Sequence, residues 1–147
     1  PEEGHRKMEE VLKNHSAYEK FLSFVAAQGG DTEEIKDTKK LIHADYVVEI
    51  NAPEDGYISS IVAEEVGIAA LMLGAGRETK ESLLDYSAGF RLLKKTGDSV
   101  VKGECIALLY ANAEEKIAPA KQRFLDAISF SQEPVEKQPL IKQVIQE

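Results

Sequence analysis

The chain has 147 residues, of which 43% are hydrophobic and 30% are charged, the proportions of a globular protein long enough to bury a core. Its net charge is −8, from 26 acidic and 18 basic residues, without a dense basic cluster. Because proteins bind nucleic acid chiefly through lysine and arginine on its phosphates, nucleic acid is not an expected partner. No apolar run approaches the ~18 residues needed to span a bilayer, and the first ten residues contain no apolar signal core. We therefore expect a cytoplasmic protein that has no membrane partner.

The first 31 residues are predicted to form two short amphipathic helices. Apolar residues recur at helical spacing in both, namely Met8, Val11 and Leu12, then Phe21, Phe24 and Val25. Ser16 lies three residues before Glu19, a pattern typical of a capping box at the start of the second helix. The sequence QGGD at 28–31 predicts its end, because glycine readily adopts the left-handed conformation found there. The pair is too small to fold alone, so its apolar faces require a partner.

Residues 32–43 are expected to form a linker or a short helix, with a boundary near His43. DTEE at 31–34 could cap such a helix, but KDTKK at 36–40 carries little apolar content. Beyond the boundary, YVVEINA (46–52) and YISSIVA (57–63) are predicted strands, because β-branched residues are frequent in both. They are separated by PEDG, whose proline and glycine are typical of a turn.

The second half is predicted to alternate helices with strands. EEVGIAALMLGAG (64–76) is helical in composition and ends on glycines, whereas SAGFRLLKK (87–95) is extended. TGDSVVKGE (96–104) predicts two glycine turns, and CIALLYA (105–111) predicts a buried strand. Asn112, three residues before Glu115, could cap a long helix through Phe124, Leu125 and Ile128. QPLIKQVI (138–145) alternates apolar and polar residues, so we expect a short closing strand there.

LMLGAGRETK (71–80) invites comparison with a phosphate-binding loop. Such a loop places its glycines before a helix, so that backbone N–H groups and the positive end of the helix point at the anion. Here Gly74 and Gly76 follow a helical run, and the end of a helix presents carbonyl groups instead. The complete G-x-G-x-x-G pattern is also missing, and no Gly-Lys-Ser/Thr follows. The favoured interpretation is a helix stop with a tight turn.

The remaining candidate residues indicate no catalytic or metal site. His5, His15 and His43 lack metal-ligand spacing and are expected at the surface. Cys105 lies in an apolar run, which favours a buried, unreactive thiol over a nucleophile. The acidic pairs at 64–65 and 114–115 lie near predicted helix starts, where they would interact with the helix dipole. We expect no cofactor, no metal and no catalytic residue in this chain.

Two stretches, INAPEDGYISSI and TGDSVVKGECIALLY, each place a glycine turn between strands. They resemble the two halves of biotinyl and lipoyl carrier domains. Ala52, Pro53, Gly56 and Ile58 match the first half, and Gly97, Asp98, Val100, Gly103 and Glu104 match the second. The chain departs from carriers in two ways: it has no Met-Lys-Met or Asp-Lys-Ala tripeptide to accept a prosthetic group, and a helical insertion, about 63–85, separates the halves.

VAAQGGD (25–31) followed by GYISSIVAEEVGIAALMLGAGRETKESLLDYSAGFRLLKKTGDSVVKGECIALLYAN (56–112) closely resembles the C-terminal region of pyrimidine-nucleoside and thymidine phosphorylases. The resemblance implies an α+β fold. Residues 1–31 would be the last helices of an incomplete catalytic α/β domain, 32–43 a linker or short helix, and 44–147 the C-terminal α/β-hammerhead domain, which is barrel-sandwich-like.

The resemblance also implies a function for the parent enzyme. Enzymes of this family are pentosyltransferases of nucleoside salvage, which use phosphate as co-substrate to convert a pyrimidine nucleoside into free base and pentose 1-phosphate. Their phosphate loop resembles Lys-His-Ser-Thr-Gly-Gly, which does not occur here, so no catalytic residue is carried over. We expect a C-terminal fragment, produced by design or by proteolysis, that is inactive alone and structural in the parent. Its partner would be the remainder of the catalytic domain, in a homodimeric parent, and the loop of Gly74, Gly76 and Arg77 could approach one wall of the cleft.

Two other function classes stay open. The chain could be a biotinyl- or lipoyl-carrier relative, although it lacks the carrier lysine motif. It could also be a free-standing interaction module that shares the hammerhead fold. The apolar helices at 8–25 argue against such a module, because their faces require a body to pack on.

Overall fold

The computed structural model describes residues 1–40, 44–77, 79–137 and 139–145. The chain divides into two compact units, Pro1–His43 and Ala44–Glu147. It is a mixed α+β chain with two small antiparallel sheets, as the sequence predicts. Within the described ranges, no helix is long and apolar enough to cross a membrane.

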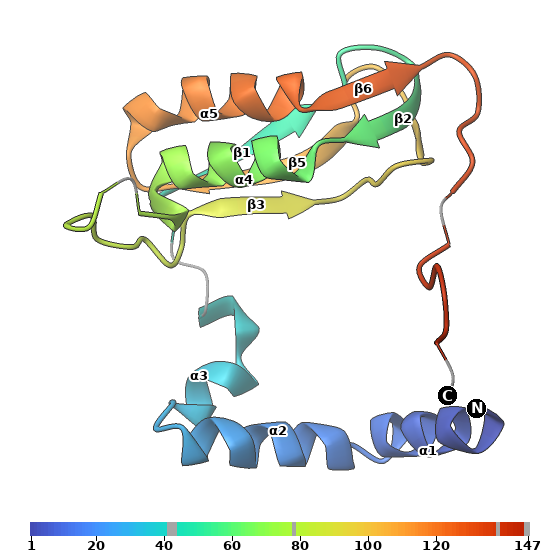
Figure 1. The fold of residues 1–147 in the computed structure, drawn as a ribbon. Coiled ribbons are helices and arrows are strands. Elements are labelled where there is room, and N and C mark those ends of the chain that lie inside the picture. The colour runs from blue at the N-terminus through green and yellow to red at the C-terminus, as the bar shows by residue number, and fades with distance from the viewer. Residues whose placement is uncertain (41–43, 78, 138, 146–147) are drawn as a thin grey trace. The chain divides into compact units, whose positions relative to one another are not determined.

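The first unit contains α1 (Glu2–Lys13), α2 (Ser16–Ala27), the short α3 (Thr32–Lys36) and the 3₁₀ turn η1 (Thr38–Lys40) (Figure 1). The two predicted helices are confirmed, and so is the glycine stop of α2. Gly29 has φ +80°, its N–H donates to the Ala26 carbonyl, and the Gly30 N–H donates to the Val25 carbonyl, which together form a Schellman motif. The predicted boundary residue His43 lies outside the described residues.

The helix starts are only partly as predicted. Asp31 does cap α3, where its Oδ1 accepts a hydrogen bond of 2.7 Å from the Glu33 N–H. The capping box at Ser16 is wrong, because Ser16 is already the first helical residue and makes no side-chain cap. Asn14 fulfils that role from outside the helix, since its Oδ1 accepts from the Ser16 N–H at 2.9 Å.

The second unit is built on two three-stranded antiparallel sheets. One has the order β1 (Tyr46–Asn51), β5 (Cys105–Ala111), β3 (Gly89–Leu92), and the other has the order β4 (Ser99–Val100), β2 (Gly56–Ile61), β6 (Ile128–Ser131). The strands predicted at 46–52, 57–63, 87–95 and 105–111 are therefore confirmed.

The predicted closing strand is wrong. Residues 139–145 form no strand, and Gln138 lies outside the described residues. The strand that closes the second sheet is β6, ten residues earlier, which pairs with β2 through Ile58 with Phe130 and Ile61 with Ile128. Alternation of apolar and polar residues does not by itself make a strand, because a strand also needs a partner strand. The partners of β2 are β4 and β6.

Two helices pack side by side in this unit, α4 (Ala63–Ala70), continued by the π-helical turn η2 (Leu71–Ala75), and α5 (Glu114–Asp126) (Figure 1). Arg123 Nε of α5 lies 2.5 Å from Glu65 Oε2 of α4. Phe124 is fully buried and stacks on Phe90 of β3, with ring centroids 4.7 Å apart. This contact fixes α5 against the first sheet. The largest fully buried side chains of the core are Phe124, Ile50, Ile58, Ile106 and Leu109.

Candidate functional site

The glycine run that resembles a phosphate loop ends a helix. Gly74 has φ +109°, a conformation that interrupts the helical backbone of η2 and that side-chain-bearing residues rarely adopt. Its carbonyl accepts a hydrogen bond of 2.9 Å from the Asp85 N–H. Gly76 lies close to the Leu71 side chain, and Arg77 is exposed. The predicted helix stop is confirmed, and the structure adds the contact with Asp85.

Asp85 belongs to a polar cluster that the sequence analysis did not identify. Its Oδ1 accepts hydrogen bonds from the Ser87 N–H at 3.0 Å and the Ser87 hydroxyl at 2.7 Å. Asn112, at the end of β5, donates from Nδ2 to Asp85 Oδ2 and to Ser87 Oγ, both at 2.7 Å, while its Oδ1 accepts from the Asp45 N–H at 2.8 Å. We call Asp45, Asp85, Ser87 and Asn112 the polar lock. It joins the segment between η2 and β3 to the start of β1 and the end of β5.

The predicted cap of α5 by Asn112 is therefore wrong. The N-cap residue is Ala113, and no side chain caps this helix. Both amide hydrogens and the carbonyl oxygen of Asn112 are already engaged in the polar lock. The pair of acidic residues Glu114 and Glu115 does lie in the first turn, as predicted, where it complements the helix dipole.

The electrostatics of the polar lock disfavour an anion beside Gly74. The hydrogen bond from the Ser87 hydroxyl is the largest effect and lowers the pKa of Asp85 below its ordinary value. Burial, the next largest, opposes it, while the Asn112 amide and backbone N–H groups lower the pKa further. Asp85 is thus a carboxylate at neutral pH, directly next to the carbonyl end of η2. A phosphate at this place would meet two groups of its own sign. The arrangement is suited to joining segments of chain.

The two stretches that resemble carrier halves face each other across backbone hydrogen bonds. Ala52 donates to the Glu104 carbonyl and accepts from the Gly103 N–H, at 2.8 and 2.9 Å. Ile58 donates to the Asp98 carbonyl and accepts from the Gly97 N–H, at 3.0 and 2.8 Å. The two glycines that donate these bonds both belong to the second stretch and lie in the left-handed region, Gly97 at φ +86° and Gly103 at φ +85°.

Ion pairs flank both glycine turns. Lys137 Nζ lies 2.6 Å from Asp98 Oδ1, and Lys94 Nζ lies 2.7 Å from Glu104 Oε1. These ammonium groups, each helped by a backbone N–H, lower the pKa of Asp98 and of Glu104 below the ordinary range. Lys102, next to Gly103, donates its backbone N–H to Asp55 Oδ1 at 2.7 Å, which joins this turn to the turn between β1 and β2.

The other candidate residues lie apart from one another. His5 is exposed and pairs with Glu9 at 3.4 Å, and His15 is exposed with φ +63°, whereas His43 lies outside the described residues. Cys105 is half-buried, with Sγ 3.3 Å from the Ala107 carbonyl. In the described ranges, no group of three or more His, Cys, Asp or Glu residues could hold a metal ion.

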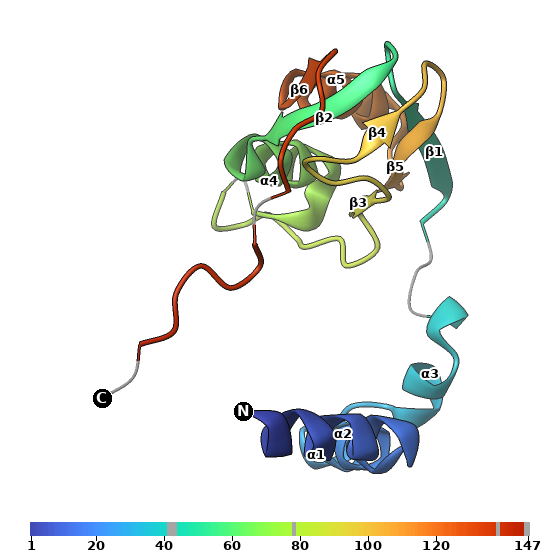
Figure 2. The same ribbon diagram turned by 90° about the vertical axis from the view of Figure 1, so that its right-hand side faces the viewer.

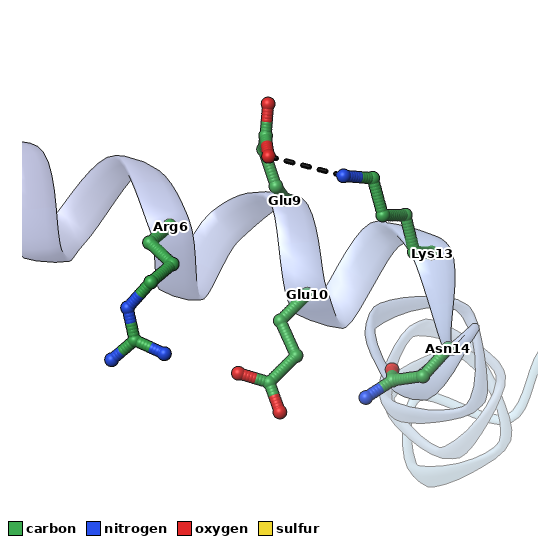
Figure 3. Close-up of a pocket in the computed structure, with 5 residues that line it drawn as sticks. All are labelled: Arg6, Glu9, Glu10, Lys13 and Asn14. Carbon is green, nitrogen blue, oxygen red and sulfur yellow. Dashed lines mark hydrogen bonds and ion pairs between the residues drawn. The ribbon is translucent and has the colours of Figure 1, made fainter.

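One surface depression lies on α1 alone. Figure 3 shows that its walls are exposed charged and polar side chains of this helix, with an ion pair between Lys13 and Glu9; the lining residues are Arg6, Glu9, Glu10, Lys13 and Asn14. Opposite charges one helical turn apart are typical of a solvated helix face. The depression offers neither an enclosed volume nor a convergent set of polar groups for a ligand.

The second unit is thus a mixed α+β domain of two antiparallel sheets joined by glycine turns, with an inserted helix. The family described as "Pyrimidine nucleoside phosphorylase C-terminal domain" matches residues 57–131. The pyrimidine-nucleoside phosphorylase of Geobacillus stearothermophilus is 46% identical over 140 residues, which cover 95% of this chain and 32% of that protein. The corresponding enzyme of Bacillus subtilis is 50% identical over 113 residues, covering 77% of this chain and 26% of that protein.

The chain belongs to the pyrimidine nucleoside phosphorylase family, which it matches through the C-terminal domain. It spans about a third to a quarter of the length of these relatives. The match therefore favours this family over the carrier domains that the two glycine-turn stretches also resemble.

Proposed function

We propose that this chain acts as the C-terminal part of a pyrimidine-nucleoside phosphorylase, with its second unit as the α/β-hammerhead domain. The parent enzyme would use phosphate to convert a pyrimidine nucleoside into free base and pentose 1-phosphate, as a cytoplasmic homodimer. In that enzyme the chain has a structural role, and the phosphate- and base-binding groups lie elsewhere. The identity with the Geobacillus stearothermophilus enzyme along 95% of the chain is the observation that carries this proposal.

The packing of the first unit supports a role as part of a larger body. Among residues 1–37, 39 and 40, none is buried. Large apolar side chains lie exposed along α1 and α2, namely Met8 (61%), Leu12 (64%), Tyr18 (40%), Phe21 (46%) and Phe24 (61%). Helices of this length are marginal in water without tertiary packing. We propose that the remainder of the catalytic domain covers these faces in the parent enzyme.

The loop of Gly74, Gly76 and Arg77 has a secondary part in the proposal. The polar lock holds its start through Gly74 and Asp85, while Arg77 stays exposed. We propose that the loop stiffens one wall of the parent's substrate cleft and contributes no group to the reaction.

A chimera tests the proposed function. The segment of the Geobacillus stearothermophilus enzyme that aligns with this chain is replaced by the chain itself, and phosphorolysis of uridine and thymidine is measured. We expect a folded, active chimera. Replacing Phe21 and Phe24 by Asp should lower its activity by about a hundredfold or more, because each change leaves an unpaired charge at a buried contact. Ser23→Asp, on another face of the same helix, should leave the activity nearly unchanged. A folded chimera that has no activity would overturn the proposal.

A further inference from the structure

The segment after β6 contacts two turns of the second unit. Gln132 Nε2 donates to the Asp55 carbonyl at 3.0 Å, in the turn between β1 and β2. Five residues further on, Lys137 Nζ lies 2.6 Å from Asp98 Oδ1, in the turn between β3 and β4. Where the segment leaves β6, the Ser131 hydroxyl donates to the Glu133 carbonyl and accepts from the Glu133 N–H, and these bonds bend the chain. Figure 2 shows this segment passing β2 on its way from β6.

This segment packs closely against Gly97. A Cβ atom at this position would lie 2.6 Å from Lys137 Cγ and 3.2 Å from the Val135 carbonyl oxygen, so the segment fits only against a residue that has no side chain. Gly103 occupies the corresponding place in the turn between β4 and β5, with nearly the same φ, and a Cβ there would meet nothing within 4 Å. The positive φ favours glycine at both positions. Only at position 97 would a side chain also collide with the segment after β6.

Lys137 and Asp98 together line two neighbouring surface hollows. Tyr57, Leu93 and Ser99 contribute to one hollow, and Ile61, Leu92 and Thr96 contribute to the other. We propose that residues 132–137 are a releasable strap that fastens the Gly97 turn to the Asp55 turn, and that release of this strap joins the two hollows into one groove. The strap is a conformational device within the second unit and does not depend on the proposed function.

Trypsin cleavage of the whole chain tests the strap with an internal reference. Lys137 is held by Asp98, whereas Lys142 lies on an exposed segment without regular structure. Cleavage after Lys137 requires the strap to open, and its rate follows the population of the open form. Mass spectrometry of the peptides released from the C-terminus gives the ratio of cleavage after Lys137 to cleavage after Lys142. We expect this ratio to be well below one in the wild-type chain.

Gly97→Ala and Gly103→Ala form a matched pair. Both changes place a side chain at a φ near +85°, at a residue whose N–H donates to the backbone of the first stretch, Gly97 to Ile58 and Gly103 to Ala52. Both therefore introduce similar backbone strain. Only Gly97→Ala collides with the strap, and we expect it to raise the cleavage ratio about tenfold while Gly103→Ala leaves the ratio at the wild-type value. Equal ratios in the two variants would overturn the proposal.

A second pair of variants applies if Gly97→Ala does not fold. Asp98→Asn keeps an oxygen that can accept the hydrogen bond from the Lys95 N–H. It removes the negative charge that pairs with Lys137. Glu104→Gln breaks the ion pair between Glu104 and Lys94 beside the Gly103 turn and does not contact the strap. We expect Asp98→Asn to raise the ratio about two- to fivefold, the range for an exposed ion pair, and Glu104→Gln to leave it unchanged. An unchanged ratio in Asp98→Asn would contradict the strap.

Discussion

Replacing Asn112 by Asp separates the two roles that its position suggests. As an N-cap of α5, aspartate would serve at least as well as asparagine, because its carboxylate also complements the helix dipole. In the structure, the Nδ2 group of Asn112 instead donates to Asp85 and Ser87, and α5 has no side-chain cap. If Asn112 were a cap, Asn112→Asp should leave the free energy of unfolding unchanged or raise it. If Asn112 belongs to the polar lock, the same change should lower it.

The loss follows from the contacts. The variant removes two hydrogen bonds of 2.7 Å and places a second carboxylate beside Asp85. Each exposed hydrogen bond contributes about 0.5–1 kcal/mol, and two unit charges ~3 Å apart in water repel by ~1.4 kcal/mol. Rotation of the new side chain toward solvent relieves part of this repulsion, so we expect a decrease of about 1–3 kcal/mol in the free energy of unfolding at pH 7.

Urea unfolding of the wild type, Asn112→Asp and Asn112→Ala, followed at pH 7 and at pH 3, provides the assay. The repulsion needs both carboxylates charged, so it disappears when either is protonated. The difference between Asn112→Asp and the wild type should therefore narrow below about pH 4. Asn112→Ala, which lacks the repulsion, should lose about 1–2 kcal/mol at pH 7. An Asn112→Asp variant as stable as the wild type at pH 7 would refute the polar lock.

Further predictions concern the core, the glycines and the acidic turns. Phe124→Ala should lower the free energy of unfolding by about 3–5 kcal/mol in a urea titration, because this fully buried ring stacks on the first sheet; a loss below ~1 kcal/mol would contradict the packing. Gly74→Ala should cost about 1–2 kcal/mol at its φ of +109°, whereas Gly67→Ala, inside α4 with open space around it, should stabilise the chain by about 0.5–1 kcal/mol; equal effects of the two changes would contradict the assigned backbone. The pKa of Asp98 is lowered chiefly by Lys137, so its contribution to stability is complete above about pH 4 and is lost as the pH falls through the lower folded-state value. Asp98→Asn should accordingly make unfolding less dependent on pH in this acidic range, and an unaltered acid profile would argue against the ion pair.

The elements of this fold that depend on local patterns could be predicted from the sequence. The strands follow runs of β-branched residues, and the ends of α2 and of the inserted helix follow from Gly29 and Gly74, which the backbone needs at positive φ. The glycine turns at 97 and 103 are predictable for the same reason. In each case the residue that determines the structure lies within the element itself.

The errors lie where distant segments decide the outcome. Asn112 has the sequence context of a cap, but partners at residues 45, 85 and 87 compete for its amide. Residues 139–145 have the alternation of a strand, but the segment that pairs with β2 beside β4 is β6. Asp85 and Ser87 could have been noted as an Asp-x-Ser turn signal, but nothing local indicates that Gly74 and Asn112 meet them.

Phosphorolysis by the 147-residue chain alone tests the central claim most directly. Uridine or thymidine is incubated with phosphate and the chain, and release of free base is compared with release by the intact Geobacillus stearothermophilus enzyme at equal molar concentration. If the chain is a structural domain and the phosphate- and base-binding groups lie elsewhere in the parent enzyme, we expect no release of free base above the uncatalysed background. Turnover close to that of the intact enzyme would contradict the account.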